Sequence, residues 1–345
     1  MKFTIIGAGA IGAITGAYLA RAGHDVTLVD TVADHLAAIR KHGIKLEGRS
    51  ELTQRVAAAI EPNQLRAPLG VVLCAVKTLH TAHALAPVAG LLGSDEYVVS
   101  MQNGLAFNDV AAVVGPLRTL AACFNFGGHY EGPGRILHGT TGGFAVGELD
   151  GRMTPRVREL REALAAVQEC EATDNILGCI WTKMALASSF FATALVDADV
   201  ADILGRPKYQ PLMLDLIAET VAVAEASGVV LTDLHGFDPR AVRFGDRSNS
   251  SSAHVIEVMR QYWLNGAQPR TGIWIDLAVR KRTTEAGPQL GGLIAAAERV
   301  GVPVPRNRAV YQMITEIETG RRGFAWQNLD EVERRAAATL SGDRG

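Results

Sequence analysis

The sequence has few cysteines, no excess of charge of one sign and no long uncharged stretch that lacks glycine. Its four cysteines lie in apolar surroundings without a CxxC pair, which argues against disulfides and a zinc site and favours a reducing compartment. The 34 basic and 36 acidic residues leave a net charge of −2, which gives no general attraction to nucleic acid or to an anionic membrane surface. These absences predict a cytoplasmic protein.

Two apolar stretches resemble membrane segments only superficially. Residues 3–20 carry no charge, but their glycines would weaken a continuous apolar helix. The stretch from Met184 to Val196 is too short to span a bilayer. We therefore expect neither a signal peptide nor a membrane-spanning segment.

The chain of 345 residues is 48% hydrophobic and 20% charged, as expected of a globular protein with room for two domains. Its first part alternates β-rich runs with helical patterns, which predicts an α/β, Rossmann-type domain with a parallel sheet. The expected helix covers residues 11–22. The expected strands cover residues 2–7, 25–30, 71–76, 96–102, 118–126 and 142–149.

After about residue 155 helical patterns dominate, and no further strand is expected. Residues 234–254 are polar and serine-rich, which predicts a long loop. The expected helices cover residues 178–196, 211–228, 252–264, 272–286, 289–301 and 306–320. We thus predict a Rossmann domain at 1–172, an all-helical domain at 173–330 and a charged, frayed tail at 331–345.

The stretch "GAGAIG" matches G-x-G-x-x-G directly after a predicted strand and at the start of a predicted helix. The first glycine permits a tight turn, the second lets backbone N–H groups approach a pyrophosphate, and the third allows close packing of the helix on the strand. This context favours a dinucleotide-binding loop over a merely flexible one. Its predicted cofactor-binding residues are Gly7, Ala8, Gly9, Ala10, Ile11 and Gly12.

The second predicted strand ends at Asp30, 18 residues beyond Gly12. A carboxylate there can accept hydrogen bonds from the adenosine ribose and would repel a 2′-phosphate. No arginine stands beside it, so NAD is favoured over NADP, although NADP stays open. The alternative is that Asp30 is only a turn or cap residue.

Two polar residues, Lys77 and Asn103, follow later predicted strands, where ligands bind in open α/β sheets. Each also has a plain structural interpretation, a solvated helix start for Lys77 and an Asn-Gly turn for Asn103. His80 and His83 share a helix face but have no carboxylate or thiolate cluster nearby, so we expect surface residues and no metal site.

The stretch "WTKMALASSFF" places one charge, Lys183, in an apolar helix. A lysine held in a cleft can exchange a proton with a C–O oxygen and stabilise its developing charge during hydride transfer. Glu285 is the candidate carboxylate that would orient it, and Gly287 and Pro288 suggest that Glu285 ends a helix. The alternatives are a snorkelling lysine and a surface ion pair for Glu285.

Together these residues resemble the ketopantoate reductase (2-dehydropantoate 2-reductase) family over about residues 1–320. The motifs are "GAGAIG", "VKT" at 76–78, "QNG" at 102–104, "NILGCIWTK" at 175–183, "RKRTTE" at 280–285 and "GVPVP" at 301–305. The resemblance implies a Rossmann domain, an all-helical domain and an active site between them. It implies that Lys183 is the general acid, that Asn103 contacts cofactor and substrate, and that Glu285 supports the site. Gly127 joins the predicted cofactor-binding residues.

Several positions depart from the family pattern. Ala187 and Phe191 stand where ketopantoate reductases usually carry asparagines, and Thr271 and Gly272 replace a serine pair. Gly287 and Leu290 replace a polar pair after the glutamate, and Asp30 departs from the usual preference for NADP. Losing two buried amides would cost about 1–3 kcal/mol each with a small polar keto acid. A less polar, bulkier or aromatic substrate is therefore expected, with Asn103, Ala187, Phe191 and Thr271 as substrate residues.

Three functions follow as hypotheses. The first is an NAD-linked dehydrogenase acting on a hydroxy or oxo compound less polar than ketopantoate, and the second is an authentic ketopantoate reductase. The third is a non-catalytic dinucleotide-binding regulator. The expected partner is a small-molecule substrate, with neither nucleic acid nor membrane, and a homodimer is compatible with the composition.

Overall fold

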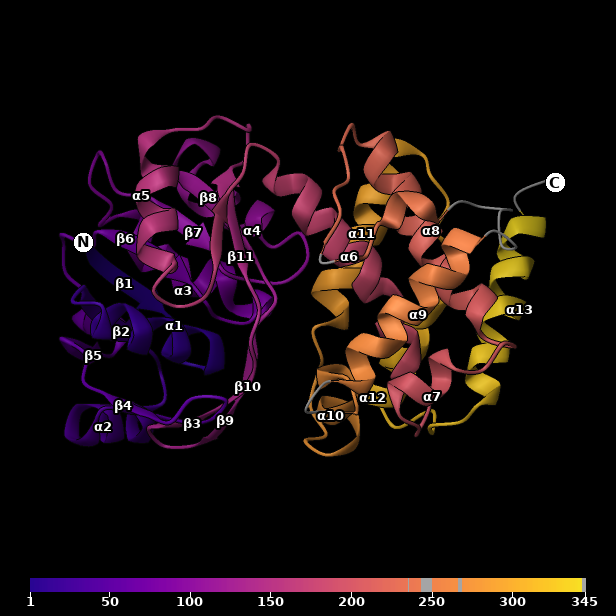
Figure 1. Cartoon of the computed structure of the whole chain (residues 1–345), viewed down its shortest axis with the longest axis horizontal. Coiled ribbons are helices and arrows are strands. Elements are labelled where there is room, and N and C mark those ends of the chain that lie inside the picture. Colours follow the sequence, from indigo (N-terminus) through magenta and orange to yellow (C-terminus); the bar gives the residue numbers. More distant parts are fainter. Residues whose placement is uncertain (235, 243–249, 266–268, 343–345) are drawn as a thin grey trace. The chain divides into compact units, whose positions relative to one another are not determined.

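A computed structural model describes residues 1–234, 236–242, 250–265 and 269–342. The chain forms two compact units, Met1–Ile176 and Leu177–Gly345 (Figure 1). The predicted boundary after residue 172 lies just before this division. Each unit is described separately below.

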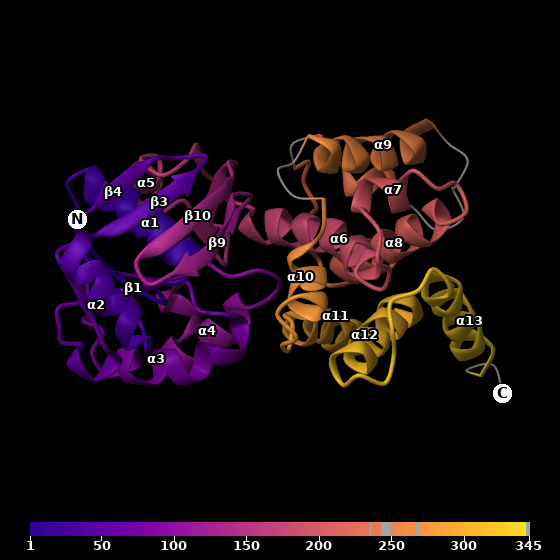
Figure 2. The same cartoon turned by 90° about the horizontal axis from the view of Figure 1, so that it is seen from below.

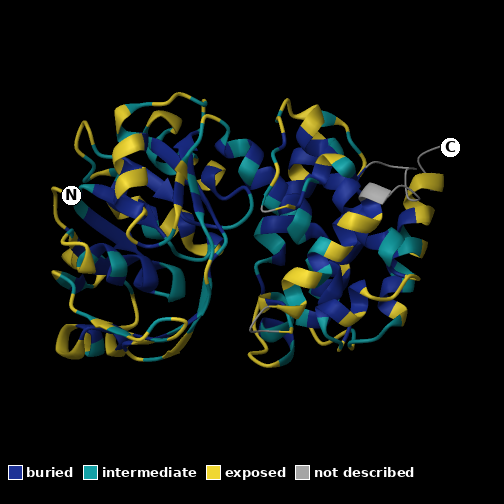
Figure 3. Ribbon diagram, in the orientation of Figure 1, coloured by how far each residue is buried: buried dark blue, intermediate teal, exposed yellow. Residues whose placement is uncertain are grey.

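The first unit is built on an eight-stranded sheet with the strand order β12-β11-β8-β7-β6-β1-β2-β5. Every neighbouring pair is parallel except β8 and β11. The central strands β6, β7 and β8 are buried throughout, as their almost wholly apolar sequences predicted (Figure 3). The strands are β1 (Lys2–Ile6), β2 (Asp25–Val29), β5 (Ala58–Ile60), β6 (Val71–Cys74), β7 (Val98–Ser100), β8 (Thr119–Phe124), β11 (Phe144–Glu148) and β12 (Cys170–Ala172).

Helix α1 (Ala10–Arg21) lies between this sheet and a second, four-stranded sheet (Figure 1). Its residues Gly12–Ala17 are all buried, because an apolar helix covered on two sides needs no polar face. The second sheet contains, in order, β4 (Leu52–Gln54), β3 (Ile44–Gly48), β10 (Arg135–Thr140) and β9 (Gly127–Gly132). The other helices of this unit are α2 (Ala33–His42), α3 (Thr81–Ala89), α4 (Phe107–Val114) and α5 (Pro155–Leu164).

In the described part of the second unit the regular elements are helices, and the one β contact is an isolated bridge between Leu234 and Phe237. Helix α8 is buried along most of its length and contacts α9, α11 and α12, so it forms the centre of this unit's core (Figure 2). The helices are α6 (Ile176–Thr193), α7 (Val200–Leu204), α8 (Gln210–Ala226), α9 (Ser250–Leu264), α10 (Gly272–Ala278), α11 (Ala286–Val300), α12 (Pro305–Glu318) and α13 (Gln327–Gly342).

The stretch "GVPVP" joins α11 to α12. Gly301 ends α11 in the left-handed conformation with a φ of 69°, and Pro305 is the first residue of α12. Glycine after a helix end and proline at a helix start are the residues that these positions favour.

Helix α6 is 18 residues long, and with a mean hydropathy of 1.3 it could cross a membrane by length and composition alone. However, 67% of it is buried inside the protein, which marks it as a core helix. It is the only such helix in the described part of the chain.

Several predicted elements were wrong. The second sheet and β5 were missed, because these strands are short or rich in glycine and polar residues. The expectation of no strand after residue 155 was wrong, since β12 adds to the edge of the main sheet beside β11. In the predicted loop at 234–254, α9 already begins at Ser250, and residues 243–249 lie outside the described residues.

The predicted helix at 272–286 was also wrong, because α10 ends at Ala278. The carboxylate of Asp276 accepts hydrogen bonds from Arg280 and Arg282 at 3.0 Å each, which holds the following segment against α10. Lys281 has a φ of 48°, which is incompatible with a continuing helix. Glu285 consequently precedes the first residue of α11 and does not end a helix.

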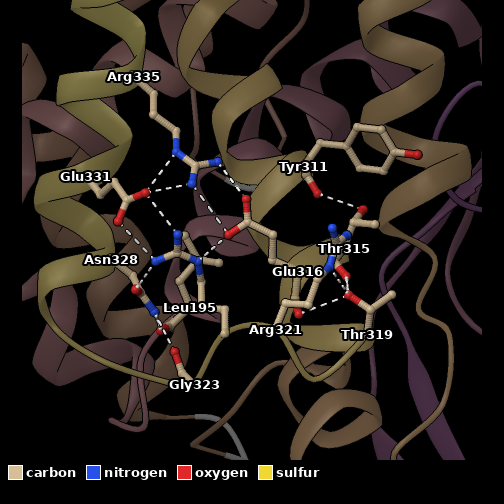
Figure 4. A network of polar contacts seen from close by, with 11 residues as sticks. Leu195, Tyr311, Thr315, Glu316, Thr319, Arg321, Gly323, Asn328, Glu331 and Arg335 are labelled. Atoms are coloured by element: carbon tan, nitrogen blue, oxygen red, sulfur yellow. Dashed lines mark hydrogen bonds and ion pairs between the residues drawn. The ribbon is translucent and has the colours of Figure 1, made fainter.

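The predicted frayed tail at 331–345 is mostly helix α13, of which Val332 and Ala336 are fully buried. Figure 4 shows how its side chains pair with α12 and the connecting segment. Glu331 accepts hydrogen bonds from Arg322 and Arg335, and Glu316 of α12 binds the same two guanidinium groups. The charged residues that suggested a frayed tail instead form the ion pairs that hold α13 against α12 and the segment before α13.

Candidate functional site

The glycine-rich loop connects β1 to α1, and its three motif glycines meet three different steric requirements. Gly7 has a φ of 99°, and a Cβ there would lie 2.8 Å from the nitrogen of Val76. A Cβ on Gly12 would lie 2.0 Å from the carbonyl oxygen of Gly7, so the start of α1 can pack closely on the loop. A Cβ on Gly9 would meet no atom within 4 Å, so the space in front of this residue is open. The loop thus has the shape of a pyrophosphate-binding turn.

The sheet brings Asp30, Lys77 and Asn103 to the same edge as this loop. Strands β2, β1, β6 and β7 are parallel neighbours, so their carboxyl ends lie side by side. Cys74 and Ser100 are register partners, and Lys77 and Asn103 each follow three residues later. This is the edge at which ligands bind in open α/β sheets.

The carboxylate of Asp30 braces the glycine-rich loop. One oxygen accepts a hydrogen bond from the N–H of Ala8 at 2.7 Å. The other accepts from the N–H groups of Thr31 and Val32 at 2.8 and 3.0 Å. Asp30 therefore holds the turn that follows β2, and its contact with a ribose stays a prediction.

His35 supports the same loop and was missed in the sequence. It is 2% exposed, and its Nδ1 accepts a hydrogen bond from the N–H of Gly134. The proton must therefore lie on Nε2, which donates to the carbonyl oxygen of Ala8 at 2.8 Å. Ala8 is thus held on both sides, by Asp30 and by a neutral His35. The only local signal was the position of His35 beside Leu36 on the buried face of α2.

Gln102 connects the two segments that carry Lys77 and Asn103. Its side-chain N–H group donates to the carbonyl oxygen of Val76 at 2.9 Å and to the hydroxyl of Thr81 at 2.8 Å. Its side-chain oxygen accepts a hydrogen bond from the thiol of Cys74, and burial raises the pKa of that thiol to about 12, so it stays protonated. The "QNG" motif therefore supplies a brace in Gln102 next to the candidate ligand-binding residue Asn103.

In the helical unit, Lys183 lies on a partly exposed stripe of α6. The partly exposed residues of this stripe are Cys179, Lys183, Leu186, Ala187 and Phe190. At 100° per residue, Ala187 lies about 40° from Lys183 around the helix axis and Phe190 about 20°. Phe191 lies about 80° away and is only 3% exposed, within the core. Its position does not support the predicted role as a pocket wall, and Phe190 is the phenylalanine on the stripe of Lys183.

The backbone on both sides of Glu285 is fixed by its neighbours. The fully buried Thr284 donates from its N–H and its hydroxyl to the carboxylate of Glu318, at 2.8 and 2.7 Å. The same hydroxyl accepts a hydrogen bond from the N–H of Ala286 at 3.1 Å. We call Thr284 and Glu318 the Glu285 clamp. The partly exposed Glu285 carboxylate makes no hydrogen bond or ion pair within the described part of the chain.

The remaining predicted residues occupy separate places. Thr271 is 6% exposed and caps α10, where its hydroxyl accepts a hydrogen bond from the N–H of Trp274. Gly127 is the first residue of β9, in the second sheet of the first unit. His80 and His83 are exposed, as predicted. Among the described residues no group of three metal-binding side chains occurs.

Comparison with known proteins gives a family for both units. Residues 3–151 match the family described as Ketopantoate reductase PanE/ApbA, and residues 175–318 match its C-terminal domain. A 2-dehydropantoate 2-reductase of Mesorhizobium japonicum is 33% identical over 285 residues, covering 75% of this chain and 86% of the relative. One of Streptococcus pyogenes is 22% identical over 317 residues, covering 91% and 97%.

Two solved structures are similar over nearly the whole chain. A PanE/ApbA family ketopantoate reductase from Ralstonia eutropha JMP134 superimposes with a TM-score of 0.77 at 26% identity, covering 94% of this chain and 100% of that one. D-mandelate dehydrogenase with NADH and anilino(oxo)acetate superimposes with a TM-score of 0.79 at 19% identity, covering 93% and 99%. The family matches to both units decide the assignment: the chain belongs to the ketopantoate reductase family of NAD(P)-dependent oxidoreductases.

Proposed function

We propose that the protein is an NAD-linked dehydrogenase of 2-hydroxy acids, or reductase of 2-oxo acids, whose substrate is less polar than ketopantoate. The observation that carries this proposal is the stripe of α6, on which Ala187 follows Lys183 by one turn. The methyl group of Ala187 offers no hydrogen bond to a polar substituent, where the family pattern implies an amide. A substrate with an apolar substituent loses no hydrogen bond, and therefore no binding free energy, when this amide is replaced by a methyl group.

Lys183 is the proposed general acid and base. A bound nicotinamide cofactor supplies the hydride in reduction and accepts it in oxidation. In reduction, the ammonium group of Lys183 donates a proton to the carbonyl oxygen of the substrate, and in oxidation its neutral amine takes the proton of the hydroxyl. Glu285, whose backbone is held by the Glu285 clamp and whose carboxylate makes no ion pair with the residues that the structure describes, is the proposed partner that would orient Lys183 when substrate and cofactor are bound. Lys77 and Asn103 are the proposed cofactor contacts at the edge of the sheet, together with the glycine-rich loop.

The proposed preference for NAD rests on Asp30. Its carboxylate lies at the end of β2 and would repel the 2′-phosphate of NADP. The D-mandelate dehydrogenase similar to this chain was solved with NADH, which is consistent with such a preference within this fold. Open space at Gly9 fits a pyrophosphate against the start of α1.

The proposal is tested by steady-state kinetics with NADH and NADPH on a panel of 2-oxo acids that includes ketopantoate and aliphatic and aryl members. We expect NADH to be preferred, and apolar 2-oxo acids to be reduced with a higher kcat/KM than ketopantoate. The Lys183→Ala variant should lose turnover and still bind NADH, whereas the control variant Lys208→Ala, at an exposed lysine paired with Asp330, should keep both. Full turnover by Lys183→Ala would refute the mechanism.

The second candidate function is 2-dehydropantoate 2-reductase itself. It is favoured by the 33% identical relative of that name. Growth of a pantothenate-requiring strain on this gene, together with the highest kcat/KM for ketopantoate in the panel, would establish it against the first proposal. The regulator hypothesis is set aside, because both units match a reductase family. Pairing with a second copy stays a prediction, which sedimentation equilibrium checks.

A further inference from the structure

Two aromatic side chains of the helical unit meet at the far end of the stripe that carries Lys183. The ring of Phe190, on α6, lies 5.2 Å from the ring of Trp263, on α9, at an interplanar angle of 85°. Both residues are partly exposed. Such an edge-to-face pair is stabilised by its ring quadrupoles, so the two rings hold each other in a fixed orientation.

The aromatic surface extends beyond this pair. The ring of Tyr262 meets that of Trp263 at 5.9 Å and 86°, and Tyr262 is 56% exposed. Aromatic rings left partly open next to a candidate catalytic group are more typical of a binding surface than of a finished core. No charged group lies on the α6 stripe between Lys183 and Phe190.

The spacing along α6 fits a substrate of limited size. Phe190 follows Lys183 by seven residues, which corresponds to about 10 Å along the helix axis on nearly the same face. Ala187, which lies between these two residues on this face of α6, has only a methyl side chain.

We propose that Phe190 and Trp263 form the wall that binds the aryl substituent of a 2-aryl-2-oxo or 2-aryl-2-hydroxy acid. This inference rests on the proposed function and adds the substrate class and two specificity-determining residues. Phe190 lies beyond Ala187 on the helix face that carries Lys183, and Trp263 fixes the orientation of Phe190. An aliphatic substituent forgoes the contact between rings.

The test compares reduction of phenylglyoxylate and of 2-oxobutyrate by NADH in wild type, Phe190→Ala and Trp263→Ala. We expect kcat/KM for phenylglyoxylate to fall roughly ten- to a hundredfold in Phe190→Ala, mainly through KM, and kcat/KM for 2-oxobutyrate to fall much less, so that the ratio of the two shifts toward 2-oxobutyrate. Phe190→Tyr, which keeps a ring, should retain the aryl preference. Trp326→Leu is the matched control, because that indole stacks on Tyr209 elsewhere in the helical unit.

A second measurement separates failure of this inference from failure of the proposed function. In a Lys183→Ala background saturated with NADH, quenching of tryptophan fluorescence measures phenylglyoxylate binding without turnover. Loss of binding on adding Phe190→Ala supports the wall even if the wild type reduces no 2-oxo acid. An aryl preference that is unchanged in both Phe190→Ala and Trp263→Ala overturns it, even if both acids are reduced.

Discussion

Replacing Asn328 by alanine should destabilise the helical unit by about 3 kcal/mol. Asn328 is 4% exposed, and its side chain donates to the carbonyl oxygens of Leu195 and Gly323 at 2.9 Å each (Figure 4). Its side-chain oxygen accepts a hydrogen bond from Arg322 at 2.8 Å. Each of the three hydrogen bonds contributes about 1 kcal/mol net. The carbonyl of Leu195 keeps the N–H of Ala325 as a donor, so the loss should not greatly exceed this sum.

Tryptophan fluorescence isolates this unit, because all four tryptophans lie at positions 181, 263, 274 and 326. A loss of about 3 kcal/mol should lower the urea midpoint by about 1 M or more, given slopes of about 1–3 kcal/mol per molar. The neighbouring exposed variant Gln327→Ala is the control and should change stability by less than about 0.5 kcal/mol. If Asn328→Ala unfolds at the same urea concentration as this control, the hydrogen bonds of Asn328 do not contribute to the stability of the unit.

Three further predictions follow from the contacts described above. Acid should weaken the packing of α13 on α12. Hydrogen bonds from Arg335 lower the pKa of Glu316 below 4.5, and those from Arg322 lower the pKa of Glu331 in the same way. The stabilisation by these two ion pairs is therefore complete above pH 4.5 and is lost as the pH falls through the two lowered pKa values. Urea midpoints at pH 7 and about pH 3.5 should therefore differ less in Arg335→Ala than in wild type. Thr284→Val should lower kcat severalfold and leave the affinity for NADH unchanged. The control variant Thr283→Val, at the neighbouring exposed position, should keep the kcat of the wild type. Equal kcat values for the two variants would refute the role of the Glu285 clamp. Asp30→Asn should raise the ratio of kcat/KM for NADPH over that for NADH by about tenfold or more. The reason is that it removes a repulsion of about 1–4 kcal/mol between the carboxylate and the 2′-phosphate of NADPH. The control variant Asp34→Asn, at an exposed position, should leave this ratio unchanged.

The sequence alone was sufficient to predict features that depend on residues close together in the chain. The glycine motif depends on contacts within a few residues, as between Gly12 and the carbonyl of Gly7, and on the apolar strand that precedes it. The place of Lys77 and Asn103 followed from apolar runs that can only be central strands of a parallel sheet. Such signals do not depend on the rest of the chain.

The sequence did not predict features that depend on contacts between residues far apart in the chain. The helix breakers after Glu285 suggested that it ends a helix. Instead Thr284 binds Glu318, 34 residues further along the chain, and Glu285 precedes the start of α11. The alternative of a surface ion pair for Glu285 is not seen with the two arginines of "RKRTTE", because both Arg280 and Arg282 bind Asp276. The second sheet depends on pairing of β3 with β10, about 90 residues apart, which leaves only weak local patterns in either strand.

The prediction of Phe191 as a substrate residue missed the partly exposed phenylalanine by one position. Carrying over family positions four and eight residues beyond the lysine selected Phe191, but a helix turns by 100° per residue and eight residues overshoot the lysine by about 80°. The position seven residues on, Phe190, returns to within about 20° of Lys183 and is the one left partly open. The same stripe explains how an apolar helix accommodates a lysine: Lys183 lies on a partly exposed stripe of α6, while most of the other residues of the helix are buried. Substrate preference in this chain is therefore to be sought along that stripe, in the small Ala187 and the aromatic Phe190, and the buried Phe191 should be exchangeable for leucine without changing which acids are reduced.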